Sequence, residues 1–291
     1  MRFSVVIPTM RREEILDATL ESLKRCDPAP YEVIVIDADP EGSSHPVVTA
    51  FDHQVSPAVR YLRSVPSLTR QRNYGIDDAS GEVIVFLDDD VTIQPDIFAR
   101  LAEIYVDASV VGGTGRVIEP DSGRVGDRTS PLRRLLLGSG REGTFTRYGY
   151  PRYLRNLDEP RDVEFMQGCF MSARYDAAAR VRFDEHLGGY ALAEDEDFSY
   201  RLSRLGRIRY VPEIRVEHRK LGFGSQDARL FDRRVIVNRA YLFRKNFPQT
   251  LLARAQFVLL VLTLIGHRLV NREWRGARGL LDGAVAVWLK R

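Results

Sequence analysis

The chain has 291 residues, of which 44% are hydrophobic and 29% are charged. This length can bury a sizeable core, either as one large domain or as one domain with an appendage. The apolar and aromatic content excludes a disordered chain. The two cysteines, Cys26 and Cys169, exclude a zinc spacing and any disulfide framework beyond a single bridge, so we expect a reducing, cytoplasmic setting.

The net charge of +3 is distributed unevenly along the chain. Residues 215–291 carry 16 Lys and Arg against 5 Asp and Glu, so the remaining residues are acidic overall. An acidic body suits a metal site, whereas a basic tail suits phosphates or the anionic face of a membrane. We expect no nucleic-acid partner.

The first residues do not predict a signal peptide. The apolar run after Met1 and Arg2 is short and β-branched, and Pro8 interrupts it. The longest apolar run, residues 257–265, is expected to be too short to span a bilayer, since a spanning helix needs about 20 residues.

The first 115 residues alternate between strand and helix patterns. Apolar β-branched runs predict strands, and apolar residues at helical spacing predict helices. The predicted strands are residues 3–7, 31–36 and 82–87, with a further strand that begins at Val110 and is cut by Gly112 and Gly113. The predicted helices are residues 13–25, 68–79 and 95–108. This order predicts a mainly parallel α/β sheet, in which ligands bind at the carboxyl ends of the strands.

The rest of the chain is less regular. Residues 121–161 are rich in Gly, Arg, Pro and Tyr, which predicts a loop-rich excursion near the site. An apolar stretch around Gly168 follows. Helices are then predicted at residues 194–205, 228–245 and 251–270, and a strand at residues 207–211.

Asp88, Asp89 and Asp90 directly follow an apolar strand that should be buried. Three carboxylates at one strand end repel one another, and a hard cation relieves that repulsion. Mg²⁺ or Mn²⁺ takes one or two such carboxylates and completes its shell with substrate phosphate oxygens. A solvated acidic turn is the alternative.

Three further motifs have both a functional and a purely structural interpretation. Arg70 and Asn73 share a helix face, where they can contact a diphosphate and a ribose or form an ordinary polar surface. The four acids at residues 194–197 open a helix, where the helix dipole favours them, but four exceed what capping needs and one can serve as a general base. His218 can ligate a metal or form a hydrogen bond at the surface.

In their order, these motifs resemble the family 2 glycosyltransferases with the GT-A fold. The resemblance rests on the ordered set and covers about residues 3–245. The segments that carry it are Val5-Val6-Ile7-Pro8-Thr9, Val33-Ile34-Val35-Ile36-Asp37, Arg70-Gln71-Arg72-Asn73-Tyr74-Gly75, residues 81–90, Phe183-Asp184-Glu185, Glu194-Asp195-Glu196-Asp197 and His218. It implies a GT-A catalytic domain at residues 1–225, with a nucleotide-sugar half at about 1–115 and an acceptor half at about 116–225, and a helical basic extension at residues 226–291.

The resemblance also implies roles for the matching residues. Asp195 is expected to be the catalytic base. Asp88 and Asp90 match the family's Asp-x-Asp motif and, with His218, are expected to hold Mn²⁺ or Mg²⁺. The residues expected to contact the nucleotide or the substrate are Pro8, Thr9, Arg11, Asp37, Asp39, Arg70, Asn73, Asp88, Asp89, Gly168 and Glu194.

The implied reaction is the inverting transfer of one sugar from a UDP-, dTDP- or GDP-sugar to an acceptor hydroxyl. Asp195 would deprotonate that hydroxyl, and the metal and Arg70 would neutralise the leaving diphosphate. Asp37-Ala38-Asp39-Pro40 replaces the family's usual Asp-Asp-Gly-Ser, which leaves open whether Asp37 or Asp39 contacts the base. The Gln-x-x-Arg-Trp motif of processive synthases is absent, which indicates single transfer rather than polymerisation.

The basic tail has two interpretations. Trp274 and Trp288 flank an arginine cluster at residues 268–278, and such a composition suits an interfacial helix on the inner face of the plasma membrane. A lipid-linked or carbohydrate acceptor, as in polysaccharide and cell-wall assembly, would then be expected. The alternative is that the tail packs on the catalytic domain or forms a homodimer.

Two competing functions belong to other classes. A sugar-phosphate nucleotidyltransferase would need a Gly-rich, Lys-bearing loop after the first strand, but residues 8–12 are Pro-Thr-Met-Arg-Arg. A catalytically inactive module that binds a nucleotide-sugar or a membrane is the non-enzyme alternative. The intact acids at residues 88–90 and 194–197 argue against it.

Overall fold

A computed structural model of the chain describes residues 1–52, 58–119, 140–154, 157–188, 191–219 and 227–288. The chain divides into two compact units. The first comprises Met1–Arg124 and Tyr153–Lys220, and the second comprises Val125–Arg152 and Leu221–Arg291. Much of the predicted loop-rich excursion, residues 120–139, lies outside the described residues.

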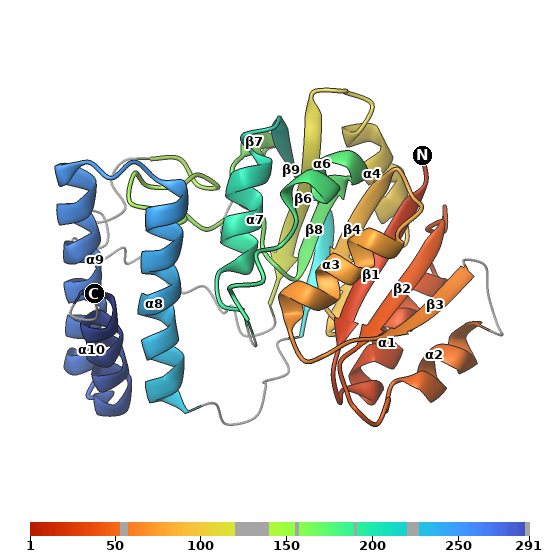
Figure 1. Cartoon of the computed structure of the whole chain (residues 1–291). Helices are drawn as coiled ribbons and strands as arrows, with labels where there is room; N and C mark the ends of the chain where they lie inside the picture. Colours follow the sequence, from red (N-terminus) through yellow and green to blue (C-terminus); the bar gives the residue numbers. More distant parts are fainter. Residues whose placement is uncertain (53–57, 120–139, 155–156, 189–190, 220–226, 289–291) are drawn as a thin grey trace. The chain divides into compact units, whose positions relative to one another are not determined.

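The first unit is built on a mixed sheet with the strand order β3-β2-β1-β4-β8-β6-β9-β5, and β7 pairs with β9 (Figure 1). The parallel part pairs β1 with β2 and β4, and β2 with β3. β8 is antiparallel to both β4 and β6, and β5 and β7 are antiparallel to β9. The strands are β1 Phe3–Thr9, β2 Glu32–Asp37, β3 Ala58–Arg63, β4 Val83–Leu87, β5 Val91–Ile93, β6 Val110–Ile118, β7 Arg161–Val163, β8 Phe170–Arg174 and β9 Arg207–His218.

Helices cover both faces of this sheet (Figure 1). Successive side chains of a strand point to opposite faces, so the wholly buried β1 contributes Val5 and Ile7 to one core and Val6 to the other. The first core includes residues of α1 Glu13–Lys24, α2 His45–Asp52 and α4 Ile97–Ile104, and the second includes residues of α3 Leu68–Asp78, α6 Tyr175–Val181 and α7 Glu194–Leu202. The expected α/β class with helices flanking a central sheet is confirmed.

The strand prediction at Gly112 and Gly113 was wrong, because β6 runs through both glycines. A Cβ at Gly112 would lie 2.9 Å from the Leu202 side chain, and a Cβ at Gly113 would lie 3.0 Å from Oγ of Ser172. The two glycines therefore do not end the strand. They let α7 and β8 approach it closely.

Strand β9 is longer than the predicted residues 207–211 and ends at His218. Its last residues pair with β5, so that Val91 lies opposite His218. The sequence pattern did not predict α2, β3, β5, β7 or α6. The pairing of β5 with β9 matters most for function because it brings His218 to the acidic turn after β4.

The described part of the second unit contains three long helices, α8 Ala228–Asn246, α9 Leu251–Val270 and α10 Trp274–Trp288. The first two match the predicted helices, and α10 was not predicted. Arg268 of α9 pairs with the buried Asp232 of α8 at 2.9 Å, and a Cβ at Gly276 of α10 would lie 2.4 Å from that carboxylate. Contacts of this kind hold the three helices together.

Helix α9 is long and apolar enough to cross a membrane when only its length and composition are considered. This corrects the expectation based on residues 257–265, since the helix continues in both directions beyond that run. Core helices of soluble proteins can meet the same criterion, but only 22% of the most apolar window of α9 is buried.

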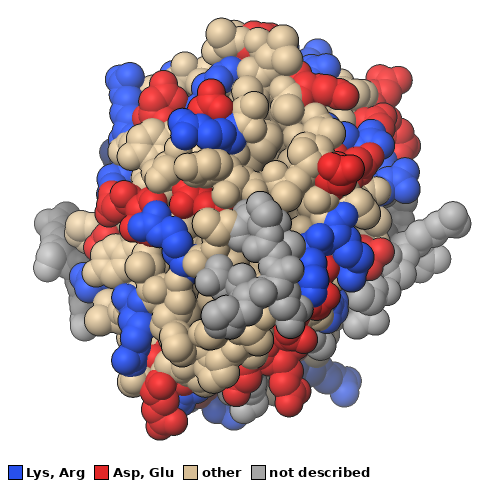
Figure 2. Space-filling view, turned by 90° about the vertical axis from the view of Figure 1, so that its right-hand side faces the viewer, with Lys and Arg blue, Asp and Glu red and all other residues tan. Residues whose placement is uncertain are grey.

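Charges are mixed on the side of the molecule that lies to the right in Figure 1. Figure 2 shows Lys and Arg interspersed with Asp and Glu there, and neither sign forms a continuous field among the described side chains.

Candidate active site

The carboxyl ends of β1, β2 and β4 meet at one edge of the sheet. The parallel register places Thr9 opposite Asp37, and Asp88 to Asp90 follow β4 next to them. Gln71 of α3 fixes this edge by donating to the backbone oxygens of Thr9 at 2.9 Å and Ile36 at 2.8 Å. The polar residues that follow these strands are therefore gathered into one place, as the strand pattern predicts.

The three carboxylates after β4 have different surroundings. Asp89 is buried and accepts from Thr9 Oγ1 at 2.8 Å and from Arg12 at 2.7 Å. Asp90 accepts from the other guanidinium nitrogen of Arg12 at 2.9 Å. Asp88 accepts from Arg72 at 2.9 Å and keeps 30% of its side chain exposed. Asp89 thus lies inside the fold, whereas Asp88 remains partly open to solvent.

His218 joins this turn from the end of β9. Its Nε2 lies 3.2 Å from Oδ1 of Asp90, and its Nδ1 lies 3.8 Å from Oε1 of Glu119. One ligand atom each from Asp88, Asp90 and His218 lie within 4.8 Å of one another. Two carboxylates and an imidazole form a donor set suited to a divalent cation such as Mn²⁺.

The electrostatics of this cluster follow from burial and from its few cations. Burial is the largest influence on Asp89 and raises its pKa to about 7 despite Arg12 and Thr9. Burial also opposes ionisation of Asp90, but hydrogen bonds from His218 and Arg12 outweigh it and lower its pKa. Burial alone would lower the pKa of His218, but the pairing with Asp90 raises it.

Arg72 links this cluster to the start of α7. Its side chain is only 1% exposed, and it donates to Glu194 at 2.9 Å as well as to Asp88. The same guanidinium donates to the backbone oxygen of Gly168 at 2.9 Å. One buried cation therefore holds together the turn after β4, the turn before β8 and the first residue of α7.

The four acids that open α7 contact four different partners. Glu194 pairs with Arg72, Glu196 accepts from Tyr153 at 3.1 Å, and Asp197 pairs with Arg201 at 2.6 Å. Asp195 accepts from the backbone amide of Gly168 at 3.0 Å and from that of Glu196 at 2.8 Å. Among the four, Asp195 has no cation within salt-bridge distance in the described part of the chain and is partly exposed.

The backbone before Asp195 is unusual. Ala191 and Ala193 have φ values of 43° and 70°, and Ala193 is left-handed at the residue that precedes α7. Alanine pays a steric cost in this region, and such strain is frequent at active sites. The turn directs Glu194 towards Arg72 and Asp195 towards Gly168.

Both of these carboxyl groups have raised pKa values. For Glu194 the causes are burial and then the charge of Asp195, and for Asp195 they are burial and then the charge of Glu196, with Arg72 opposing in each case. The pKa of Asp195 rises to about 7, close to the value that suits a general base at neutral pH.

Comparisons with known proteins agree with this chemistry. The family model described as glycosyl transferase family 2 matches residues 4–182, which is more than half of the chain. This chain belongs to glycosyl transferase family 2. It is therefore related to enzymes that transfer sugars.

Two curated relatives of this family 2 chain are glycosyltransferases by name. The "Uncharacterized glycosyltransferase YwdF" of Bacillus subtilis is 30% identical over 136 residues, which are 47% of this chain and 50% of that protein. The "GalNAc(5)-diNAcBac-PP-undecaprenol beta-1,3-glucosyltransferase" of Campylobacter jejuni is 30% identical over 91 residues, which are 31% of this chain and 29% of that protein. The chain thus matches half or less of the length of these relatives.

Solved structures confirm the GT-A fold. The mannosyltransferase PcManGT from Pyrobaculum calidifontis, in complex with GDP-Man and Mn²⁺, superposes with a TM-score of 0.63 at 15% identity and covers 100% of this chain and 88% of that one. TarS from S. aureus, in complex with UDP-GlcNAc, superposes with a TM-score of 0.62 at 16% identity and covers 99% and 82%.

The predicted nucleotide-side acids of this family 2 chain lie after β2. Asp37 is fully buried and accepts from Tyr61 at 2.9 Å and from the backbone amides of Asp39 and Ser44. Asp39 accepts from the exposed Arg11 at 3.0 Å. Burial would raise the pKa of Asp39, but hydrogen bonds from Arg11 and Ser43 outweigh it and lower that pKa. Asp37 therefore shapes the turn, and Arg11 with Asp39 forms its outer part.

The predicted pair on α3 has a shared partner. The Asn73 amide donates to the backbone oxygen of Phe183 and to Glu185, both at 3.0 Å, and accepts from the Phe183 amide at 2.8 Å. Arg70 also pairs with Glu185, at 3.1 Å, and keeps 49% of its side chain exposed. Asn73 is thus fully occupied within the protein, while Arg70 remains accessible.

Sequence reasoning missed Arg12 and Arg72, the two arginines that touch the acidic turn. Arg72 was overlooked because Arg70 and Asn73 were taken as the functional face of the helix. Spacing contained the signal, since Arg72 is four residues before the buried Ile76 and so shares its face. Nothing in the local pattern around Arg12 predicted its contacts.

Proposed function

We propose that this chain is a metal-dependent glycosyltransferase that moves one sugar from a nucleoside diphosphate sugar to an acceptor hydroxyl with inversion. The observation that carries the proposal is the Arg72 bridge, which joins the Asp88, Asp90 and His218 cluster to the acids at the start of α7. The bridge makes a cation-binding group and a candidate base parts of one site.

The residues present fit a divalent cation. Asp88 to Asp90, Glu194 and Asp195 are five carboxylates, and the arginines that contact them are Arg12 and Arg72. The excess negative charge favours Mn²⁺ or Mg²⁺ held by Asp88, Asp90 and His218. Such a cation would supply positive charge beside the leaving diphosphate.

In the proposed reaction, Asp195 accepts the proton of the acceptor hydroxyl. The oxygen forms a bond to the anomeric carbon on the face opposite the nucleotide, and the bond from that carbon to the diphosphate oxygen breaks with its electron pair. Configuration is therefore inverted. Arg70, exposed beside the site, can neutralise charge on the diphosphate, and general-base help of this kind typically contributes about 10²–10⁴-fold.

The names of similar proteins support the substrate classes. Solved neighbours hold UDP-GlcNAc and GDP-Man, which supports a UDP-, dTDP- or GDP-sugar donor. The name of the Campylobacter jejuni relative contains an undecaprenol-linked saccharide, which supports a lipid-linked acceptor and action at the inner face of the plasma membrane. The basic, partly apolar second unit is suited to such a peripheral contact.

A thermal-shift panel tests the proposal. UDP, GDP, dTDP and CDP are each added with and without Mn²⁺, because a ligand of the folded state raises stability as RT ln(1 + [L]/Kd). We expect one nucleotide to stabilise the chain only with metal, in the wild type and in the exposed control Asp17→Ala but not in Asp90→Ala. Asp195→Asn should keep the shift and lose sugar transfer. Transfer that survives in Asp195→Asn, or nucleotide binding indifferent to metal, would contradict the proposal.

A further inference from the structure

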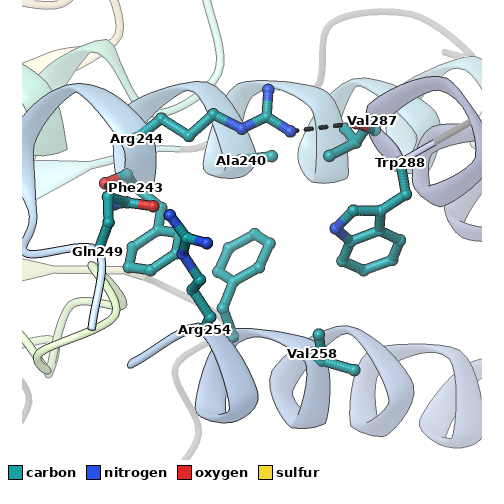
Figure 3. A pocket seen from close by; sticks show the side chains of 9 residues that line it. Ala240, Phe243, Arg244, Gln249, Arg254, Val258, Val287 and Trp288 are labelled. Carbon is teal, nitrogen blue, oxygen red and sulfur yellow. Dashed lines mark hydrogen bonds between the residues drawn. The ribbon is translucent and has the colours of Figure 1, made fainter. Parts of the chain in front are cut away.

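The second unit contains a cavity between its three long helices. It has a volume of about 460 Å³ and is lined by residues of all three helices together with Gln249. The lining residues are Ala240, Phe243, Arg244, Gln249, Arg254, Phe257, Val258, Val287 and Trp288 (Figure 3). No acidic side chain is among them.

Two arginines lie in this cavity and are not neutralised there. Arg244 donates to the backbone oxygen of Val287 at 3.1 Å, which orients its guanidinium along the cavity. Figure 3 shows Arg254 extending from α9 towards α8, and it has no hydrogen-bond or ion-pair partner for its guanidinium among the described residues. Two guanidiniums without a carboxylate favour an anion, and their geometry suits a phosphate.

The wall beside the arginines is aromatic. Phe243 and Phe257 stack with centroids 4.9 Å apart, and Trp288 meets Phe257 edge-on at 6.5 Å. A cavity with cationic groups against an apolar wall is suited to a ligand that has a phosphate joined to hydrocarbon. It is less suited to a small inorganic anion, which has no apolar part.

Helix α9 also presents an exposed apolar face. Leu251, Val258, Leu262 and Leu269 are 85%, 41%, 60% and 41% exposed and are spaced as one side of a helix. Arg254 is three residues after Leu251 and four before Val258, so it lies on the same side. Val258 also lines the cavity, so the cavity and the apolar face adjoin.

The charge of this unit complements an anionic surface. Residues 227–288 carry 11 Lys and Arg against 4 Asp and Glu. More than half of the exposed large hydrophobic side chains of the described chain also lie in these residues, 12 of 21. An amphipathic helix with basic neighbours and an apolar face is suited to lie in the interface of a bilayer.

From these observations we propose that the cavity between α8, α9 and α10 binds the phosphate headgroup of an anionic membrane phospholipid while the exposed face of α9 enters the bilayer surface. This inference rests on the proposed membrane contact of the second unit. Its test needs neither nucleotide nor metal, so it can fail while the proposed sugar transfer stands.

Vesicle sedimentation of the full chain tests the site. The chain is mixed with vesicles of phosphatidylcholine alone or of an equal mixture of phosphatidylcholine and phosphatidylglycerol. We expect binding to the anionic vesicles only. Arg244→Gln with Arg254→Gln should weaken that binding by about tenfold or more, because both arginines contact the headgroup.

The matched control removes the same charge from the same unit. Arg234 and Arg278 are exposed, lie on α8 and α10 and do not line the cavity. Arg234→Gln with Arg278→Gln should weaken binding by less than about threefold through general electrostatics alone. Equal losses in the two double variants would overturn the site and leave only non-specific attraction.

Further arms separate the other occupants. Leu262→Gln, at an exposed position, should weaken vesicle binding without changing urea unfolding, and unchanged binding would overturn the role of the α9 face. Inorganic phosphate that displaces the chain from vesicles at the concentration of the headgroups would overturn a lipid ligand. A chain that ignores both vesicles and self-associates through α9 would overturn the proposal in favour of a dimer.

Discussion

The backbone amide of Gly168 donates to the carboxylate of Asp195 at 3.0 Å, and a Cβ at Gly168 would lie 3.2 Å from the same carboxylate oxygen. The contact fixes one oxygen of the candidate base. It also leaves no ordinary room for a side chain at residue 168.

Gly168→Ala is therefore expected to lower kcat by about tenfold or more, because displacement of a reacting group by a fraction of an ångström is costly. KM for the donor should change little, since Gly168 is on the side of Asp195. Steady-state kinetics with a fixed acceptor measures both constants. An unaltered kcat in a correctly folded variant would show that Asp195 tolerates movement and would weaken its assignment as base.

Arg72→Gln is expected to destabilise the fold by about 3–5 kcal/mol, because it leaves the carboxylates of Asp88 and Glu194 in the protein without their cation. Urea unfolding measures the loss. The matched control on the same helix is Arg70→Gln, whose exposed pair with Glu185 should contribute only about 0–1 kcal/mol. Similar losses in the two variants would contradict the central role given to Arg72.

The pH dependence of transfer should report Asp195. With a pKa of about 7, this group becomes a competent base as pH rises, so kcat/KM should increase up to about pH 7 and level off above it. Glu196→Gln should move the inflection to lower pH, because the charge of Glu196 contributes to the raised pKa. An inflection that stays in place in this variant would assign it to another group.

The same shift affects stability with a definite sign. The pKa of Asp195 in the folded chain lies above the model value of 3.8, so the folded state binds the extra proton between these two values. Its contribution to the free energy of unfolding should thus fall as pH rises from about 4 to about 7. Asp195→Asn removes this dependence, and urea unfolding of the two chains across that range measures the difference.

His218→Ala should weaken Mn²⁺ binding by about tenfold or more and lower the metal-dependent shift with nucleotide, because an imidazole ligand is lost. Isothermal titration with Mn²⁺ gives the affinity. His186→Ala is the control, since that side chain is 82% exposed and distant in sequence from the cluster. Equal affinity in the two variants would remove His218 from the ligand set.

The parallel half of the fold and its acidic turn could be predicted from the sequence because the signal there is local. Phe3–Thr9 and Val83–Leu87 are continuous apolar runs that end in polar residues, and this pattern alone indicates a buried parallel strand. The helix prediction at residues 68–79 succeeded for the same reason.

What could not be predicted depends on contacts between distant residues. Gly112 and Gly113 look like a turn, and only the approach of Leu202 and Ser172 explains why a strand uses them. Arg72 looks like any arginine of a polar helix until Asp88 and Glu194 are seen beside it. In β5, three residues form a strand only because β9 pairs with them.

The pairing of β5 with β9 has a consequence for biosynthesis. Asp88 and Asp90 leave the ribosome long before His218, and the register of Val91 with His218 can form only after the chain has closed a loop of more than a hundred residues. A nascent chain that has completed the parallel strands thus holds two carboxylates of the cluster without the imidazole. Full affinity for the cation would arrive late in synthesis, together with the last strand of the sheet.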